Sequence, residues 1–326
     1  MLSRVINERN IMNTKLSRKT FDWRNYIVYI AFVIILIFFG VTLGNQGFLL
    51  PSNLLNIVRE TTMISIMAVA MTFVIASGEI DLSIGSTTAF AALISALAIQ
   101  AGFGFLGGVV AGLLSGLLVG AVNGYLTTKI AIPSFLVTLG MMQLVRGVDM
   151  WITHTNPVPI LNMTFNNVFG SGNVGPIPSL LIWSLVVLII GHFTLKKTPF
   201  GRQILATGGN RLSAEYSGVN TQRIKFTALL LTSVAAAIAG MLYSGMMQSA
   251  RYSFGDGDEL SAIAAVILGG TSLFGGNGSI IGTVIGSLMI GTINNGLIIM
   301  GLDVSQQMVV SGAIIILAVA FGKKSR

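Results

Sequence analysis

"GFLGGVVAGLLSGLLVGAVNGYL" occupies residues 104–126 and contains no charged side chain. At about 1.5 Å of rise per residue, a helix of this length crosses the ~30 Å hydrocarbon layer of a bilayer. The segment also contains a regular row of glycines, which lets a neighbouring helix approach closely. The segment therefore predicts a central helix in a membrane-embedded bundle. The row recurs every four residues, at Gly104, Gly108, Gly112, Gly116, Gly120 and Gly124.

The composition is that of an integral membrane protein. Of 326 residues, 53% are hydrophobic and 9% are charged, which gives more apolar surface than a soluble domain of this length can bury. The expected fold class is all-α, a polytopic membrane protein of about ten spans. The eighth candidate span, residues 260–273, is short, so a tilted, re-entrant or cavity-lining path stays open for it. The candidate spans are roughly 26–43, 54–77, 83–100, 104–126, 132–152, 179–195, 226–247, 260–273, 280–299 and 305–321.

The basic residues predict the orientation, because Lys and Arg are retained on the cytoplasmic side during insertion. With ten crossings, sixteen of the 19 Lys and Arg residues fall on one face, which therefore also carries both termini. The net charge of +8 is explained by this asymmetry together with anionic membrane lipid. No nucleic-acid partner is needed.

The sequence offers no catalytic chemistry. It contains no cysteine, its two histidines, His154 and His192, lie 38 positions apart, and it lacks a phosphate-binding Gly-x4-Gly-Lys-Ser/Thr loop. Glu60 and Asp149 fall near the predicted outer boundary, where Arg146 is a candidate ion-pair partner for Asp149. We therefore expect no metal site, no cofactor, no enzyme active site and no chain of carboxylates at membrane depth.

The largest predicted cytoplasmic loop spans residues 196–225. A short helix over residues 213–216 is expected there, opened by the side chain of Asn210 after a turn at Gly208 and Gly209, and ended by Gly218. A short preorganised helix suits docking into a partner's cleft. The alternative is a solvated basic loop that serves only topology.

Several motifs in order resemble the inner-membrane permeases of bacterial ABC importers for monosaccharides. The resemblance covers about residues 26–322. The motifs that carry it are "SGEIDLSIGS" (77–86), "GLLVGAVNGYL" (116–126), "TPFGRQILATGGNRLSAEYSGV" (198–219) and "DELSAIAAVILGGTSLFGGNGSIIGTVIGSLMIGTINNGL" (258–297).

This resemblance implies a type II ABC importer-like permease working as a homodimer, with a cytoplasmic ATP-binding subunit and a periplasmic sugar-binding protein as partners. The resemblance implies a transmembrane permease domain over 26–322 with a coupling loop at 196–225. The distribution of basic residues predicts a cytoplasmic tail on each side of it, over 1–25 and 323–326. The tail 1–25 itself carries no family signal. The coupling contact to the ATPase maps onto Gly208, Gly209, Asn210, Ser213, Ala214, Glu215 and Gly218.

The motif at residues 77–86 has two interpretations. By the predicted topology, Glu79 and Asp81 lie at the cytoplasmic end of the second span, where Gly78 breaks the helix. Asp81 or Ser83 could then cap the first free N–H groups of the third span. Alternatively, the turn belongs to an inner gate, in which a discontinuous helix presents polar groups to sugar hydroxyls.

Two other polar groups are candidates for function. Asn294 and Asn295 lie inside an apolar span, so they either line the pathway or form an interhelical hydrogen bond. The acidic residues Asp256, Asp258 and Glu259 fall on the predicted outer face and could dock the binding protein.

The leading hypothesis is a multi-pass permease subunit in the bacterial inner membrane that translocates ribose or a related monosaccharide, powered by a separate ATPase. One alternative is a branched-chain amino acid-type ABC permease, which would need groups for an ammonium and a carboxylate. Another is a stand-alone ion-coupled carrier. The sequence does not indicate which sugar is carried.

Overall fold

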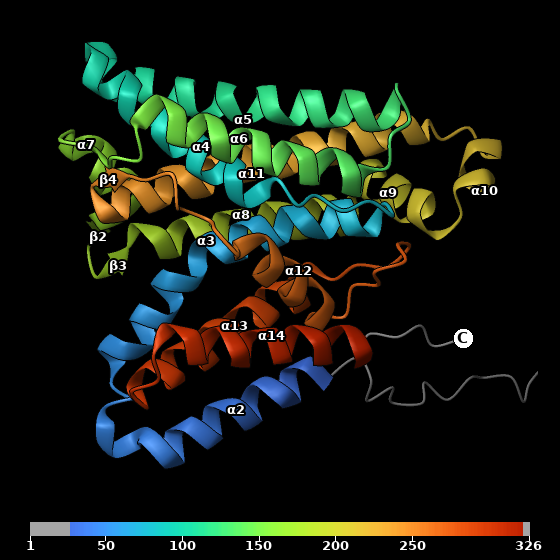
Figure 1. Cartoon of the computed structure of the whole chain (residues 1–326). Coiled ribbons are helices and arrows are strands. Elements are labelled where there is room, and N and C mark those ends of the chain that lie inside the picture. Colours follow the sequence, from blue (N-terminus) through green and yellow to red (C-terminus); the bar gives the residue numbers. More distant parts are fainter. Residues whose placement is uncertain (1–26, 322–326) are drawn as a thin grey trace, which may run out of the picture.

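The computed structural model describes residues 27–321, so the predicted tails 1–25 and 323–326 lie outside the described residues. Short turns of other helix types occur at Gly44–Gln46, Ile99–Phe103 and Asn167–Ser171. The α-helices, labelled as in Figure 1, are α2 Ile27–Leu43, α3 Pro51–Ala76, α4 Ile84–Ala98, α5 Gly104–Thr128, α6 Ser134–Thr153, α7 Met163–Asn166, α8 Ser179–Lys197, α9 Pro199–Gly209, α10 Arg211–Tyr216, α11 Thr221–Met247, α12 Asp258–Leu268, α13 Ile280–Ile299 and α14 Val304–Phe321.

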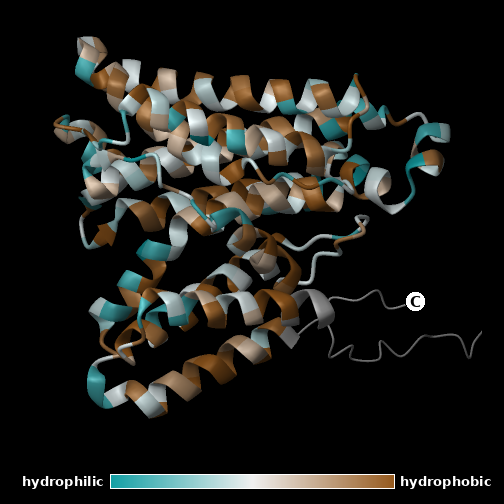
Figure 2. Ribbon diagram, in the orientation of Figure 1, coloured by the Kyte–Doolittle hydropathy of each residue, from teal (hydrophilic) through white to brown (hydrophobic). Residues whose placement is uncertain are grey.

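The predicted all-α membrane fold is confirmed. The described strands form two short antiparallel pairs, β1 Val158–Pro159 with β4 Ser249–Ala250 and β2 Asn173–Val174 with β3 Ile177–Pro178. Hydrophobic residues dominate the helices along their length, whereas hydrophilic residues gather near the strands and near α9 and α10 (Figure 2).

Seven helical stretches among the described residues are long and apolar enough to cross a membrane. One of them, Ile84–Thr128, contains both the third and the fourth predicted spans, separated by a kink at Gly102, whose φ is 91°. The eighth predicted span becomes α12, which has 11 residues and is therefore only about 16 Å long. As a helix it is too short to cross the hydrocarbon layer. The count of ten crossings stays a prediction.

The helices form two groups joined by α3 (Figure 1). α11 packs against α4 and α5 in one group, while α2 packs against α13 in the other. α3 contacts α11 and α8 on one side and α12 and α13 on the other. The long apolar helix α3 therefore holds the two groups together. Nearly every residue from Thr61 to the last residue of the helix, Ala76, is buried.

The glycine row on α5 packs closely against α4 and α11. A Cβ built on Gly112 would lie 2.2 Å from Oγ of Ser95, and one on Gly116 would lie 2.6 Å from the carbonyl oxygen of Ser233. The opposite face of α5 is exposed, with Leu106 at 72%. The prediction of close packing is confirmed, but the prediction of a central helix is wrong, because the glycines occupy only one face and α5 lies at the edge of the bundle (Figure 1).

We predict that Gly116→Val destabilises the protein by about 1–3 kcal/mol, because the added methyls have no room beside the backbone of α11. The measurement is the midpoint of denaturant unfolding in detergent micelles. Gly140→Val on α6 is the matched control, since a Cβ there would meet nothing within 4 Å. Equal midpoints for the two variants would contradict the packing argument.

Candidate functional site

A non-helical segment, residues 79–83, joins α3 to α4 inside the bundle. α3 ends at Ala76, and Gly78 follows with a left-handed φ of 86°, as predicted for the residue that ends this helix. α4 begins only at Ile84. A second non-helical stretch, residues 251–257, precedes α12 in the same way.

The first turn of α4, directly after residues 79–83, meets the second non-helical stretch where Gly85 contacts Gly255. A Cβ on Gly85 would lie 2.2 Å from the carbonyl oxygen of Gly255 and 2.4 Å from Oε2 of Glu259. Gly255 also has a φ of 68°, so both positions require glycine. Interrupted helices inside a membrane protein occur where protein or a water-filled cavity surrounds them, and in transporters they mark solute sites.

Asp81 is fully buried and anchors residues 79–83 to α11. Its Oδ1 accepts hydrogen bonds from the backbone N–H of Ser83 at 2.9 Å and from the Ser83 hydroxyl at 2.7 Å. Its Oδ2 accepts one from the Thr232 hydroxyl at 2.6 Å. The predicted cap is therefore wrong in detail, because Ser83 is the N-cap residue of α4 and makes no side-chain cap.

Asp81 reaches farther into the bundle than its predicted position at the cytoplasmic end of the second span suggests. Thr232 lies eleven residues after Thr221, the first residue of α11, which corresponds to about 16 Å along the helix axis. A carboxylate at this depth was not expected from the sequence. The segment runs back into the bundle after Gly78, and this path depends on tertiary contacts.

Side chains of α5 and α6 supply further hydrogen bonds to the segment. The backbone N–H of Ile80 donates to the Ser134 hydroxyl at 3.2 Å, and that of Leu82 donates to the Thr138 hydroxyl at 3.0 Å. The side-chain amide of Asn123 donates to the Ser83 hydroxyl at 2.8 Å. The position of the segment is therefore determined by the helices around it.

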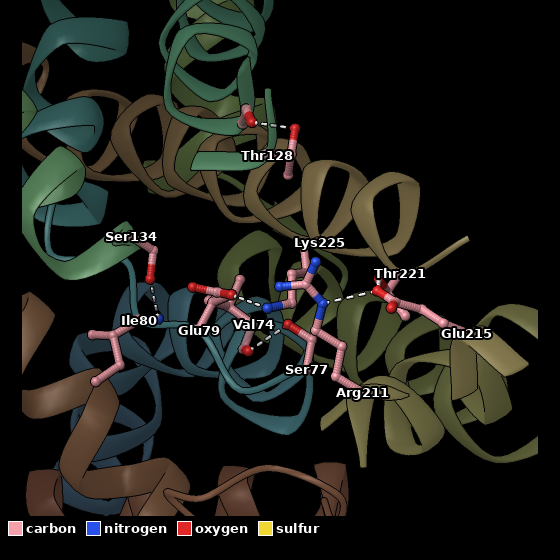
Figure 3. Close-up of polar contacts among 11 residues, drawn as sticks. Val74, Ser77, Glu79, Ile80, Thr128, Ser134, Arg211, Glu215, Thr221 and Lys225 are labelled. Atoms are coloured by element: carbon pink, nitrogen blue, oxygen red, sulfur yellow. Dashed lines mark hydrogen bonds and ion pairs between the residues drawn. The ribbon is translucent and has the colours of Figure 1, made fainter. Parts of the chain in front are cut away.

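Glu79 forms an ion pair with Lys225 of α11 (Figure 3). The two side chains are largely buried, at 12% and 17% exposure. They line a pocket of about 200 Å³ together with Thr127 and Thr128 at the end of α5, Gln222 of α11 and Arg211 of α10. Sequence reasoning had assigned Lys225 only a topological role.

The short helix predicted over 213–216 is present as α10 and begins two residues earlier, at Arg211, while its coupling role stays a prediction. Asn210 opens it, as predicted, by accepting a hydrogen bond from the N–H of Ser213 at 2.9 Å, and Gly218 follows it with a φ of 84°. Ala214 is buried beneath the helix, whereas Leu212 and Tyr216 are 65% and 90% exposed. The helix thus presents an apolar and aromatic surface outward.

Glu215 connects α10 to α11. Its Oε1 accepts hydrogen bonds from the Thr221 hydroxyl at 2.6 Å and from Nε of Arg211 at 2.8 Å (Figure 3). The Thr221 hydrogen bond, followed by the Arg211 hydrogen bond and charge, holds the pKa of Glu215 below its usual value.

Gly208 and Gly209 do not form the predicted turn, because they are the last residues of an additional helix, α9. Their role is packing. A Cβ on Gly208 would lie 2.0 Å from the carbonyl oxygen of Ala76, the last residue of α3. The N–H of Gly276 donates to that same carbonyl at 3.0 Å. The middle of the 196–225 loop is therefore packed directly against the end of α3, which precedes the 79–83 segment.

The acidic residues in and just after the second non-helical stretch differ in accessibility. Asp256 is exposed, whereas Asp258 accepts a hydrogen bond from the Tyr243 hydroxyl at 2.7 Å and Glu259 is buried. Docking by the three residues stays a prediction, and Asp256 is the one whose side chain faces outward.

The predicted ion pair between Arg146 and Asp149 is not formed. Arg146 instead donates to the carbonyl oxygens of Tyr252 and Phe254, the latter at 3.1 Å, and its Nη2 lies 3.9 Å from Oδ1 of Asp256. Asp149 is buried without a hydrogen-bond partner among the described residues. The carbonyls of the non-helical stretch compete successfully for the guanidinium.

Asn295 forms the interhelical bond that the sequence offered as one alternative. Its side-chain amide exchanges two hydrogen bonds with Asn53 of α3, at 2.9 and 3.0 Å. Asn294 accepts a 3.4 Å hydrogen bond from the Ser311 hydroxyl on α14. Both residues lie away from the 79–83 segment and its partners, and a pathway role for them stays a prediction.

The site thus combines Glu79, Asp81 and Ser83 from the predicted motif with partners that sequence reasoning missed. The available signal was the presence of polar side chains inside apolar spans. Those missed partners are Asn123, Ser134, Thr138, Lys225 and Thr232.

This bundle of apolar helices with an interrupted segment inside it is typical of a multi-pass membrane transport protein. The family model described as "Branched-chain amino acid transport system / permease component" matches residues 53–319, so the chain belongs to this family.

Several curated proteins are similar over most of their length. The ribose import permease protein of Bacillus subtilis (strain 168) is 40% identical, with 90% of each chain covered. The D-allose transport system permease protein of Escherichia coli (strain K12) is 36% identical, with 92% of each chain covered. The L-arabinose ABC transporter permease protein of Azospirillum brasilense is 34% identical over 91% of this chain and 87% of its own. No solved structure matches the chain.

We predict that Asp81→Ala abolishes solute transport and lowers stability by about 1–3 kcal/mol, because three buried donors lose their acceptor. Transport by membranes containing equal amounts of inserted protein is the measurement. Asp149→Ala serves as the control, because that carboxylate accepts no hydrogen bond among the described residues. Ordinary transport by a stably inserted Asp81→Ala variant would show that the segment is no gate.

Proposed function

We propose that this chain is the membrane-spanning subunit of an ATP-driven importer that carries ribose or a related monosaccharide into the cell. The observation that supports this most is the similarity, over most of both chains, to permeases named for ribose, allose and arabinose. The polar groups at the interrupted segment are consistent with a neutral hydroxylated solute. Glu79 already has Lys225 as its partner and Asp81 has Thr232, so neither carboxylate is left to bind a charged solute.

The proposed machinery has three further parts. The transmembrane domain, residues 26–322, works as a homodimer with the pathway between subunits, and its coupling loop 196–225 docks α10 onto a separate ATP-hydrolysing subunit. A periplasmic sugar-binding protein docks on the opposite face with help from Asp256. Asp256→Asn should therefore raise the concentration of binding protein needed for half-maximal uptake.

Two alternatives remain to be separated from this proposal. The family description names branched-chain amino acids. The second alternative is an ion-coupled carrier, which would need a buried carboxylate. Asp81 is such a carboxylate, so the expected lack of one no longer argues against this alternative.

The test is uptake by the purified chain in vesicles, alone and together with its ATPase and binding protein. We expect ATP-dependent accumulation of ribose, allose or arabinose by the complete complex and no uphill transport by the chain alone. Accumulation of leucine in place of sugars would favour the amino acid alternative. Uphill transport by the chain alone, driven by an ion gradient, would contradict the proposal.

We predict that Tyr216→Ala weakens binding of the ATPase by about tenfold or more, because an exposed aromatic side chain on a rigid helix is a typical energetic centre of an interface. Titration of the purified ATPase against the permease in nanodiscs measures this. Tyr125→Ala, also exposed but on α5, is the matched control. An unchanged affinity for Tyr216→Ala would count against α10 as the docking element.

A further inference from the structure

α11 touches the interrupted segment at two places along one face. Lys225 pairs with Glu79, and Thr232 hydrogen-bonds to Asp81 at 2.6 Å. The two positions are seven residues apart, which is about two helical turns, so their side chains leave α11 in nearly the same direction. The segment is therefore attached to α11 at its entry and near its centre.

The same face of α11 is attached to the coupling helix. Thr221, four residues before Lys225 and thus one turn away, donates its hydroxyl hydrogen bond to Glu215 of α10. Figure 3 shows Glu215, Thr221, Lys225 and Glu79 following one another across this end of the bundle. α10 and residues 79–83 are therefore both attached to α11, at positions one helical turn apart.

The two attachments differ in how easily they can be released. Asp81 is completely buried, so separating it from Thr232 would leave a carboxyl oxygen without a hydrogen-bond donor and without access to water. Glu79 and Lys225 line the pocket of about 200 Å³, so water can replace each partner when the two separate. Asp81 is suited to a permanent pivot and Glu79 to a releasable contact.

We propose that the Lys225–Glu79 ion pair is a latch, closed in this structure, that must open for solute to pass, and that α11 transmits the movement of α10 to it. Lys225 acts as a positioning residue for the segment, while Asp81 stays attached to Thr232 as the pivot. This inference rests on the proposed function, because the movement of α10 is driven by the docked ATPase.

The first test compares variants in vesicles that hold the complete complex, with sugar transported per ATP hydrolysed as the readout. Lys225→Gln and Glu79→Gln should lower this ratio by roughly tenfold, within the usual range of coupling free energies. The charge exchange Glu79→Lys with Lys225→Glu should restore most of it. Arg223→Gln, which removes a charge from the same end of α11 without breaking an ion pair among the described residues, should leave it unchanged.

The second test uses the absence of cysteine from the chain. Glu79→Cys with Lys225→Cys introduces the only two thiols, which a short, reducible bifunctional thiol reagent can join. Joining them should abolish the remaining sugar uptake, and reduction should return it to the level before treatment. Because the comparison is made on one variant before and after cross-linking, a folding defect cannot imitate the result.

Uptake that continues at full rate after complete cross-linking would overturn the latch, as would wild-type coupling in both single glutamine variants. If the wild-type complex accumulates no monosaccharide, the proposed function is wrong, and the latch is judged on ATP hydrolysis alone. Lys225→Gln must then raise hydrolysis in the absence of solute above that of Arg223→Gln, and equal rates would overturn it.

Discussion

Inside a membrane, each backbone N–H and C=O needs a partner within the protein, and residues 79–83 lack the helix that would supply one. Side chains replace it: Ser134 and Thr138 bind the backbone, while Thr232 holds Asp81. Ser134 and Thr138 belong to α6, whereas Thr232 belongs to α11. The hydrogen bonds of residues 79–83 therefore help to fix how α6 and α11 lie around α4. The interrupted segment therefore both organises the bundle and provides its candidate functional site.

Close approach of backbones makes this arrangement possible. Gly85 at the start of α4 meets Gly255 in the second non-helical stretch, and Gly208 at the end of α9 meets the carbonyl of Ala76 at the end of α3. α4 leads toward the end of the bundle that carries β1, where Gln100 donates to the carbonyl of Pro159. α12 leads toward the opposite end, where the loop that follows it contacts Gly208 (Figure 1). α4 and α12 thus run in opposite directions from the contact between Gly85 and Gly255. This contact connects the two ends of the bundle.

Parts of the candidate site could be predicted because their signals are local. Asn210 caps a helix three residues away and Gly218 ends it, so neighbouring residues were sufficient evidence. The same local reasoning failed for Asp81 and for Arg146. Each had a plausible partner nearby in the sequence, but the packed structure offers a better one from a distant element.

The sequence by itself determined an all-α bundle of membrane-spanning helices with a short helix, α10, between α8 and α11. Span length, hydrophobicity and helix ends depend on residues within a few turns of one another. Only the tertiary structure decided that Glu79 pairs with Lys225, 146 positions away, and Asp81 with Thr232, 151 positions away. Such pairs form when helices pack, and packing depends on the shapes of whole helix faces, which no local pattern of residues specifies.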